Sequence, residues 1–263
     1  MSTQYKIIFF GIIAVIFFNA FKDSKTTTSN TQAVKQAEYI QKPNNFFATE
    51  PTKDDWPTLT GTEEALAEDI LAANYYIVFD GSGSMKENGC SGNQSKLSVA
   101  RTALQRFTSK IPANANVGVL VFDKNSVSQR VALGVNNRSR LVDAINQVEA
   151  GSVTPLNTSI SFGFSALQKQ AEKQLGYGDY NLVIVTDGKA SKGEDPSKTV
   201  YNILQTSPIQ IHTIGFCIND DHVLNQPGYT YYRAANDPQS LQQGLDEVLA
   251  EAPDFNLDSF QQN

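Results

Sequence analysis

Four apolar runs recur along the chain, and each is short enough to be a single strand. They are YYIVFD (75–80), NVGVLVFD (116–123), NLVIVTD (181–187) and IQIHTIGF (209–216). Runs without polar alternation are typical of strands that are buried on both faces, as in parallel sheets. We therefore predict four central strands, of which the first three end in an aspartate.

Between these runs, apolar residues recur at the spacing of amphipathic helices. In residues 95–110, for example, Leu97, Ala100, Leu104 and Phe107 would lie on one helical face. The predicted helices are 95–110, 137–149, 157–174, 196–206 and 238–250. Strands thus alternate with helices through most of the chain.

Shorter segments predict the remaining elements. QRVAL (129–133) follows the strand at 116–123 after a short polar stretch, so these two strands should form an antiparallel edge hairpin. YTYYRA (229–234) is a second candidate for an edge strand. Thr60 and Glu63 resemble a capping box, which predicts a short helix through Leu66, Ile70 and Leu71. 

The alternation predicts an α/β fold. We expect a doubly wound, mostly parallel sheet with one antiparallel edge strand and with helices on both faces. In such sheets ligands bind beyond the carboxyl ends of the strands. Candidate functional residues should therefore follow positions 80, 123, 187 and 216.

The N-terminal segment is typical of an export signal. Residues 7–18 are apolar throughout, and 15 residues separate Lys6 from Lys22. At ~1.5 Å per residue such a helix spans ~22 Å, which is less than the ~30 Å of a hydrocarbon core. A signal peptide over 1–21 fits better than a spanning helix, and an uncleaved anchor formed by residues 7–21 stays open. Either way we expect a periplasmic, cell-envelope or extracellular location.

Composition shifts divide the rest of the chain. Residues 22–60 are rich in polar side chains and predict a linker with an irregular end that contains Trp56. The predicted domain covers 61–252, and 253–263 form a tail.

Charge and residue counts exclude several classes of protein. Lys plus Arg is 21 and Asp plus Glu is 27, so the formal charge is −6. An acidic chain lacks the basic surface that nucleic-acid binding requires, so we expect no nucleic-acid partner. Two cysteines and two histidines are too few for a four-cysteine zinc site or for most zinc and iron enzymes.

Oxygen-bearing side chains follow the predicted strands in three loops. Asp80-Gly-Ser82-Gly-Ser84 ends the first strand, Thr154 precedes a proline at the start of a helix, and Asp187 ends the third strand. Each loop alone is typical of a turn or a helix cap, but all three should meet at one edge of the sheet. Such hard oxygen ligands suit Mg²⁺, Mn²⁺ or Ca²⁺.

Together these residues resemble the signature of von Willebrand factor A (VWA) domains. Asp80-Gly-Ser82-Gly-Ser84, Thr154 and Asp187 match the metal-ion-dependent adhesion site (MIDAS) of that family, and the resemblance covers roughly residues 72–250. It implies a Rossmann-like VWA fold. It also implies that Ser82, Ser84 and Thr154 bind the metal directly, while Asp80 and Asp187 bind directly or through water.

The resemblance implies a binding module whose metal accepts an Asp or Glu carboxylate from a protein partner. We expect no enzyme, because no general base accompanies the site: His212 lies inside a strand, and His222 is expected to be an exposed loop residue. Two alternatives stay open. They are a metal-independent scaffold of the cell envelope and a metal-assisted hydrolase.

The two cysteines lie in loops at the same edge of the predicted sheet. Cys90 follows the first strand and Cys217 follows the fourth. In an exported protein we therefore predict a Cys90–Cys217 disulfide. It would hold residues 218–228 beside the metal site.

Overall fold

The structure, a computed structural model, describes residues 53–57 and 65–250. Both stretches belong to one of the two units into which the chain divides, Thr49–Asn263. The predicted signal peptide or anchor (1–21), most of the linker and the tail (253–263) lie outside the described residues. No helix among the described residues is long and apolar enough to cross a membrane.

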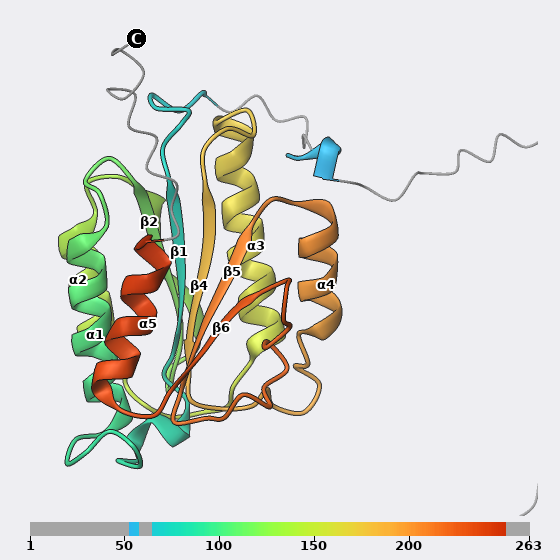
Figure 1. Cartoon of the computed structure of the whole chain (residues 1–263). Coiled ribbons are helices and arrows are strands. Elements are labelled where there is room, and N and C mark those ends of the chain that lie inside the picture. The colour runs from blue at the N-terminus through green and yellow to red at the C-terminus, as the bar shows by residue number, and fades with distance from the viewer. Residues whose placement is uncertain (1–52, 58–64, 251–263) are drawn as a thin grey trace, which may run out of the picture. The chain divides into compact units, whose positions relative to one another are not determined.

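Strands and helices alternate as the sequence predicts (Figure 1). In chain order the elements are η1 (Lys53–Asp55), β1 (Asn74–Asp80), η2 (Gly83–Lys86), α1 (Lys96–Lys110), β2 (Asn116–Phe122), β3 (Val127–Gly134), α2 (Arg138–Asn146), α3 (Leu156–Lys173), β4 (Tyr180–Thr186), α4 (Ser197–Thr206), β5 (Gln210–Phe216), β6 (Tyr231–Ala235) and α5 (Pro238–Ala250).

The six strands form one sheet in the order β3-β2-β1-β4-β5-β6. Only β3 runs antiparallel to its neighbour, and it lies at one edge, as the predicted hairpin requires. β6 pairs in parallel with β5 at the other edge. The predicted fold class is therefore confirmed. The carboxyl ends of the parallel strands gather at the lower side of Figure 1.

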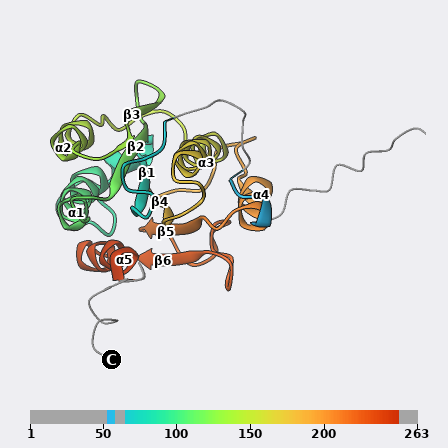
Figure 2. The same ribbon diagram turned by 90° about the horizontal axis from the view of Figure 1, so that it is seen from above.

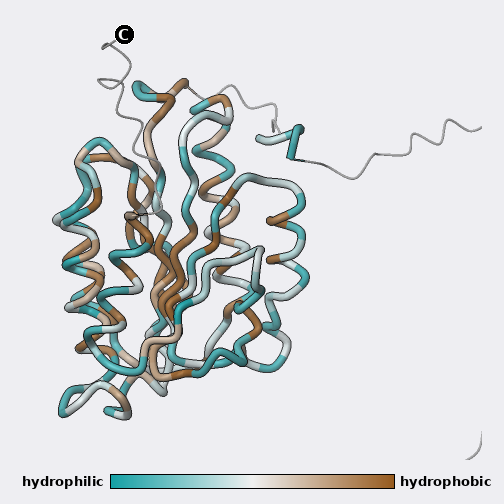
Figure 3. Tube along the Cα trace, viewed as in Figure 1, coloured by the Kyte–Doolittle hydropathy of each residue, from teal (hydrophilic) through white to brown (hydrophobic). Residues whose placement is uncertain are grey.

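Helices cover both faces of the sheet, and each face has its own core. Figure 2 shows α1, α2 and α5 on one side and α3 and α4 on the other. Along β1, Tyr75, Ile77 and Phe79 pack in the first core, whereas Tyr76 and Val78 pack in the second. All five side chains are at most 1% exposed. Figure 3 shows the same arrangement as hydrophobic strands at the centre with polar positions outside.

One predicted element is absent from the described residues. Thr60 and Glu63, the predicted cap, lie outside them, and residues 65–73 form bends and turns in place of the expected helix. The Ala67 N–H donates to the Lys173 carbonyl at 2.9 Å, and the Ile70 carbonyl accepts from the Gln174 side chain at 3.0 Å. Because these backbone groups bond to the end of α3 and the residue after it, they do not form helical hydrogen bonds with one another.

Candidate functional site

Three loops meet at the carboxyl end of the sheet and are joined by main-chain hydrogen bonds. Gly81 N–H donates to the Phe122 carbonyl at 2.7 Å, and the Gly81 carbonyl accepts from Gly151 N–H at 2.8 Å. Gly83 N–H donates to the Ser152 carbonyl at 3.1 Å. The loop after β1 is therefore fixed against the loop that leads into α3, as the sequence analysis expects.

Glycine is required at position 81 because the loops approach each other so closely. A Cβ built on Gly81 would lie 2.6 Å from the Val148 Cγ1 and 2.9 Å from the Asp123 Cβ. Both distances are shorter than a van der Waals contact. Any side chain here would push the β1 loop away from its neighbours.

Hydroxyl groups link the β1 loop to the β4 loop. The Oγ atoms of Ser82 and Ser84 lie 3.1 Å apart, and Ser84 Oγ donates to Asp187 Oδ1 at 2.7 Å. Ser82 is 2% exposed and Asp187 is 4% exposed. Three of the five predicted ligands thus form one continuous hydrogen-bonded chain.

Asp80 is fully buried at the base of this chain. Its Oδ1 accepts from Ser82 N–H at 2.7 Å, and its Oδ2 accepts from the Thr186 hydroxyl at 2.5 Å. Burial, followed by the negative charge of Asp187, raises the pKa of Asp80 to about 6. The site therefore holds two carboxylates that repel each other, a charge state that an added cation would relieve.

Thr154 reaches the same region from the third loop. Its N–H donates to Ser191 Oγ at 2.9 Å, and its carbonyl accepts from Ser191 N–H at 3.0 Å, so it is fixed to the loop after β4. A Cβ built on Gly188 would lie 3.8 Å from Thr154 Oγ1 and 3.9 Å from Ser84 Oγ. The two hydroxyls therefore flank a space that glycine leaves open.

The donor set determines which cofactor fits this place. Two carboxylates and three hydroxyls are hard oxygen ligands, which match Mg²⁺, Mn²⁺ or Ca²⁺. Among the described residues, no group of three or more His, Cys, Asp or Glu side chains could hold a metal. Any ion at this edge would therefore depend on the hydroxyl groups.

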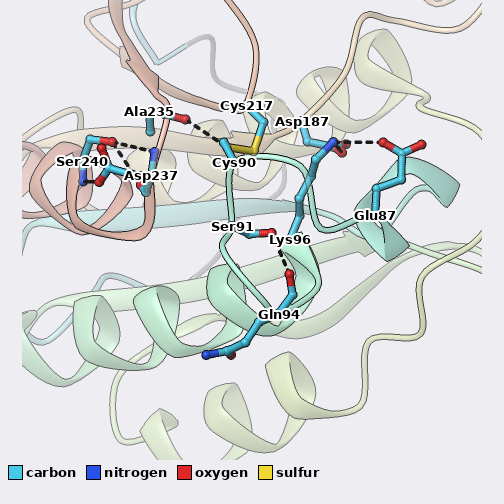
Figure 4. Close-up of a disulfide and its surroundings, with 10 residues drawn as sticks. All are labelled: Glu87, Cys90, Ser91, Gln94, Lys96, Asp187, Cys217, Ala235, Asp237 and Ser240. Carbon is cyan, nitrogen blue, oxygen red and sulfur yellow. Dashed lines mark hydrogen bonds and ion pairs between the residues drawn. A yellow bond between two sulfur atoms is a disulfide. The ribbon is translucent and has the colours of Figure 1, made fainter.

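Lys96, which the sequence analysis does not select, is part of the site. Its Nζ donates to Asp187 Oδ2 at 2.9 Å and lies 3.4 Å from Glu87 Oε2 (Figure 4). The Lys96 side chain is only 8% exposed. Burial by itself lowers the pKa of Lys96, but hydrogen bonds and charge from Asp187 and Glu87 outweigh burial and raise it.

A signal for Lys96 is present in the sequence. Lys96 is the first residue of α1, where the helix dipole disfavours a positive charge. A lysine at that position therefore indicates a nearby carboxylate, although the sequence does not say which one.

The predicted disulfide is confirmed. Cys90 and Cys217 are bonded, with their Cα atoms 5.6 Å apart. Figure 4 shows the bond next to the Lys96, Glu87 and Asp187 side chains. The bridge therefore joins the loop before α1 to the end of β5, beside the candidate site.

Of the two histidines, one lies where the sequence predicts and the other does not. His212 is packed inside β5 as expected, and its ring stacks on Tyr231 with the centroids 4.7 Å apart. The prediction that His222 is exposed is wrong. It is 4% exposed, its Nε2 lies 3.1 Å from the Gly188 carbonyl, and its ring stacks on Tyr232. The segment after Cys217 therefore does lie beside the β4 loop.

Comparison with known families agrees with this geometry. Residues 74–262 match the von Willebrand factor type A domain. The chain belongs to the VWA family. The match begins at the first residue of β1 and includes all five predicted ligands. Among curated proteins, none matches the chain.

Solved structures with the VWA fold resemble this domain at low sequence identity. An aerotolerance-related membrane protein from Bacteroides fragilis is 13% identical with a TM-score of 0.52, and the match covers 68% of this chain and 100% of that one. The PilB minor pilin from Streptococcus sanguinis is 14% identical with a TM-score of 0.54, covering 70% and 62%. The pilus adhesin SpaC from Lactobacillus rhamnosus GG is 14% identical with a TM-score of 0.53, covering 72% and 31%. At these identities the likeness concerns the fold.

Proposed function

We propose that this VWA domain binds a divalent cation through Asp80, Ser82, Ser84, Thr154 and Asp187. The bound cation would recognise an acidic group of a protein partner in adhesion or complex assembly. One observation carries the proposal. Hydroxyls from two loops flank the space beside Gly188, and one of them bonds to a buried carboxylate. Ser82, Ser84 and Asp187 are already in side-chain contact, so a bound ion would replace the hydrogen bonds among them.

The balance of charge explains why such a site would attract a carboxylate. Three of the five donors are neutral hydroxyls, so the chain supplies at most two negative charges. Mg²⁺, Mn²⁺ or Ca²⁺ held this way keeps a net attraction for an Asp or Glu side chain. The hydrogen bonds to Asp80 from Ser82 and Thr186 hold the first carboxylate in place for this purpose.

Two observations support an exported, envelope-associated role. The Cys90–Cys217 disulfide suits an oxidising compartment, and residues 7–18 read as a signal or an anchor. Proteins of similar fold include a minor pilin and a pilus adhesin. We therefore place the partner among proteins outside the cytoplasm.

Calorimetry with Mg²⁺, Mn²⁺ and Ca²⁺ tests the metal site. Gly188→Ala adds a methyl group beside both hydroxyls, and no atom outside its chain neighbours comes nearer than 3.8 Å, so the fold should be kept. We expect Gly188→Ala and Ser84→Ala to weaken binding by ~10-fold or more, because each disturbs a donor. Ser165→Ala removes an exposed hydroxyl on α3 and is the matched control.

The outcomes separate the proposal from its alternatives. Binding heat in the wild type that Ser165→Ala keeps and Gly188→Ala loses supports the metal site. No binding heat at millimolar concentrations of all three ions would overturn it and favour a metal-independent scaffold.

Capture from an envelope extract tests the acidic partner. The immobilised domain should retain a protein in Mg²⁺ or Mn²⁺ and release it on chelation. Amidation of the carboxylates in the extract beforehand should abolish retention, and so should Ser84→Ala. Retention that survives both treatments would show that the partner is not held through a carboxylate at this site.

A further inference from the structure

Both carboxylate oxygens of Asp187 already accept a hydrogen bond. Oδ1 accepts from the Ser84 hydroxyl at 2.7 Å, and Oδ2 accepts from the Lys96 ammonium at 2.9 Å. The Asp187 side chain is 0% exposed and that of Lys96 is 8% exposed, so this is a buried ion pair. The positive charge of a lysine therefore lies at the very carboxylate that we assign to the metal.

The position of Lys96 is unfavourable in every respect except this pairing. It opens α1, where the helix dipole repels a cation, and it loses the hydration of a charged group. A buried ammonium here is stable only because carboxylates face it. Its place in the fold is thus explained by the charge of the site.

Glu87 offers the same ammonium a second partner. The Lys96 Nζ lies 3.4 Å from Glu87 Oε2, and the Glu87 side chain is 69% exposed. The Lys96 N–H also donates to the Glu87 carbonyl at 2.8 Å, so the two residues stay adjacent when the side chains move. The ammonium can therefore leave Asp187 toward solvent without losing all of its charge pairing (Figure 4).

We propose that Lys96 is a resident counter-cation of the site. Without a divalent ion it neutralises Asp187, and ion binding shifts its ammonium from Asp187 to Glu87. Lys96 is thus a positioning residue that sets the affinity for metal. The inference rests on the proposed metal-binding function and adds a competing internal charge. The site would therefore stay stable without metal and would need a higher metal concentration to fill.

The test compares Lys96→Met with the wild type by calorimetry and by thermal unfolding in chelator. Removing the ammonium frees one oxygen of Asp187 and removes a positive charge that repels the metal ion. We therefore expect Mn²⁺ and Mg²⁺ to bind more tightly, by ~10-fold or more. The metal-free protein should unfold at a lower temperature, because the buried Asp187 carboxylate loses its counter-ion. Lys110→Met at the other end of α1 removes an exposed lysine paired with Asp246 and should change neither property.

A merely structural lysine would give the opposite result. If Lys96 only held Asp187 in place, Lys96→Met would bind metal as weakly as the wild type or more weakly, and that outcome would overturn the inference. Absence of binding in both proteins would instead overturn the proposed function. Binding by Lys96→Met alone would support the competition between the ammonium and the metal, but it would overturn metal binding as the function of the native domain.

Glu87 provides a second test, and its first comparison does not need the Lys96→Met variant. Glu87→Gln removes the alternative partner, so metal should bind more weakly than to the wild type. In the Lys96→Met background the same change should have no effect, because Glu87 acts through the ammonium. An equal loss in both backgrounds would mean that Glu87 acts directly, which contradicts the proposed shift.

Discussion

The two ends of the sheet both bury polar side chains, but they satisfy them in different ways. At the amino end, Asn116 donates to Asn74 Oδ1 at 2.9 Å, and Asn74 donates to the Ala72 and Asp179 carbonyls. Asn181 continues the row to His212, whose Nε2 lies 3.2 Å from Asn181 Oδ1. This end is a neutral row of side chains in which donors and acceptors match.

The carboxyl end buries charge in place of amides. Asp80 and Asp187 have more acceptor positions than the hydroxyls and the Lys96 ammonium fill, and their charges repel each other. The comparison shows that burial of polar groups does not by itself indicate a ligand site. A surplus of buried negative charge is what makes the carboxyl end the candidate site, since such charge is costly until a cation balances it.

The largest effect should follow from placing charge at the neutral end. Asn74→Asp would replace an amide that donates to two carbonyls with a carboxylate that faces them. We expect a loss of about 3 to 5 kcal/mol of unfolding free energy at pH 7, as for an uncompensated buried charge. Urea unfolding measures it. A loss below that of an ordinary surface substitution would show that the amino end tolerates charge and that the comparison fails.

Loss of the disulfide should affect mainly the carboxyl end. Cys90→Ser with Cys217→Ser should lower the unfolding free energy by about 2 to 4 kcal/mol. Amides between Glu87 and Ser95 should exchange hydrogen faster, because the bond holds this loop beside the site. The buried asparagine row is the internal control. Equal acceleration at both ends would mean that the bridge stabilises the whole domain without regional preference.

The two ends should respond to acid with opposite signs. Burial lowers the pKa of His212 to about 4, below that of a histidine in the unfolded chain. Between about pH 6.5 and 4 the unfolded chain then binds more protons at His212, so stability falls as the pH falls. The loss from this residue should reach up to about 3 kcal/mol. His212→Gln should remove that part of the pH dependence in urea titrations. An unchanged slope would place the acid sensitivity elsewhere.

Asp80 should show the reverse dependence and the smallest effect. Its pKa of about 6 lies above the value for an unfolded aspartate, so the folded state holds the proton more tightly and gains stability as the pH falls from 7 toward 4. Asp80→Asn should therefore stabilise the metal-free domain by about 1 to 2 kcal/mol at pH 7, and this gain should disappear near pH 4. Metal binding should be lost. A variant that is less stable than the wild type at pH 7 would contradict the raised pKa.

Most of the fold follows from the sequence because the central strands are continuous apolar runs. β1, β2, β4 and β5 lie within one residue of the runs that predict them. The predicted helix through Leu66 and Leu71 fails for a physical reason. Both side chains are more than 60% exposed, so the segment has no apolar face to bury.

The site was predictable only as far as local motifs reach. The loop residues 80, 82 and 84 are neighbours in the chain, and the strand order brings Thr154 and Asp187 to them. The place of Lys96 at the start of α1 indicates a nearby carboxylate but not which one, and no local pattern shows that Thr186 contacts Asp80. The burial of His222 likewise depends on tertiary contacts, with the ring of Tyr232 and with the carbonyl of Gly188 on the distant β4 loop.

Trp56 packs against the domain at the end of the sheet that lies away from the candidate ligands. Its ring contacts Phe164 and Tyr180, the first residue of β4, so residues 53–57 join the domain at the amino end of the sheet (Figure 1). The five candidate ligands lie at the opposite end. The described chain therefore enters this domain on the side away from the candidate ligands, and residues 53–57 leave the ligand end of the sheet uncovered.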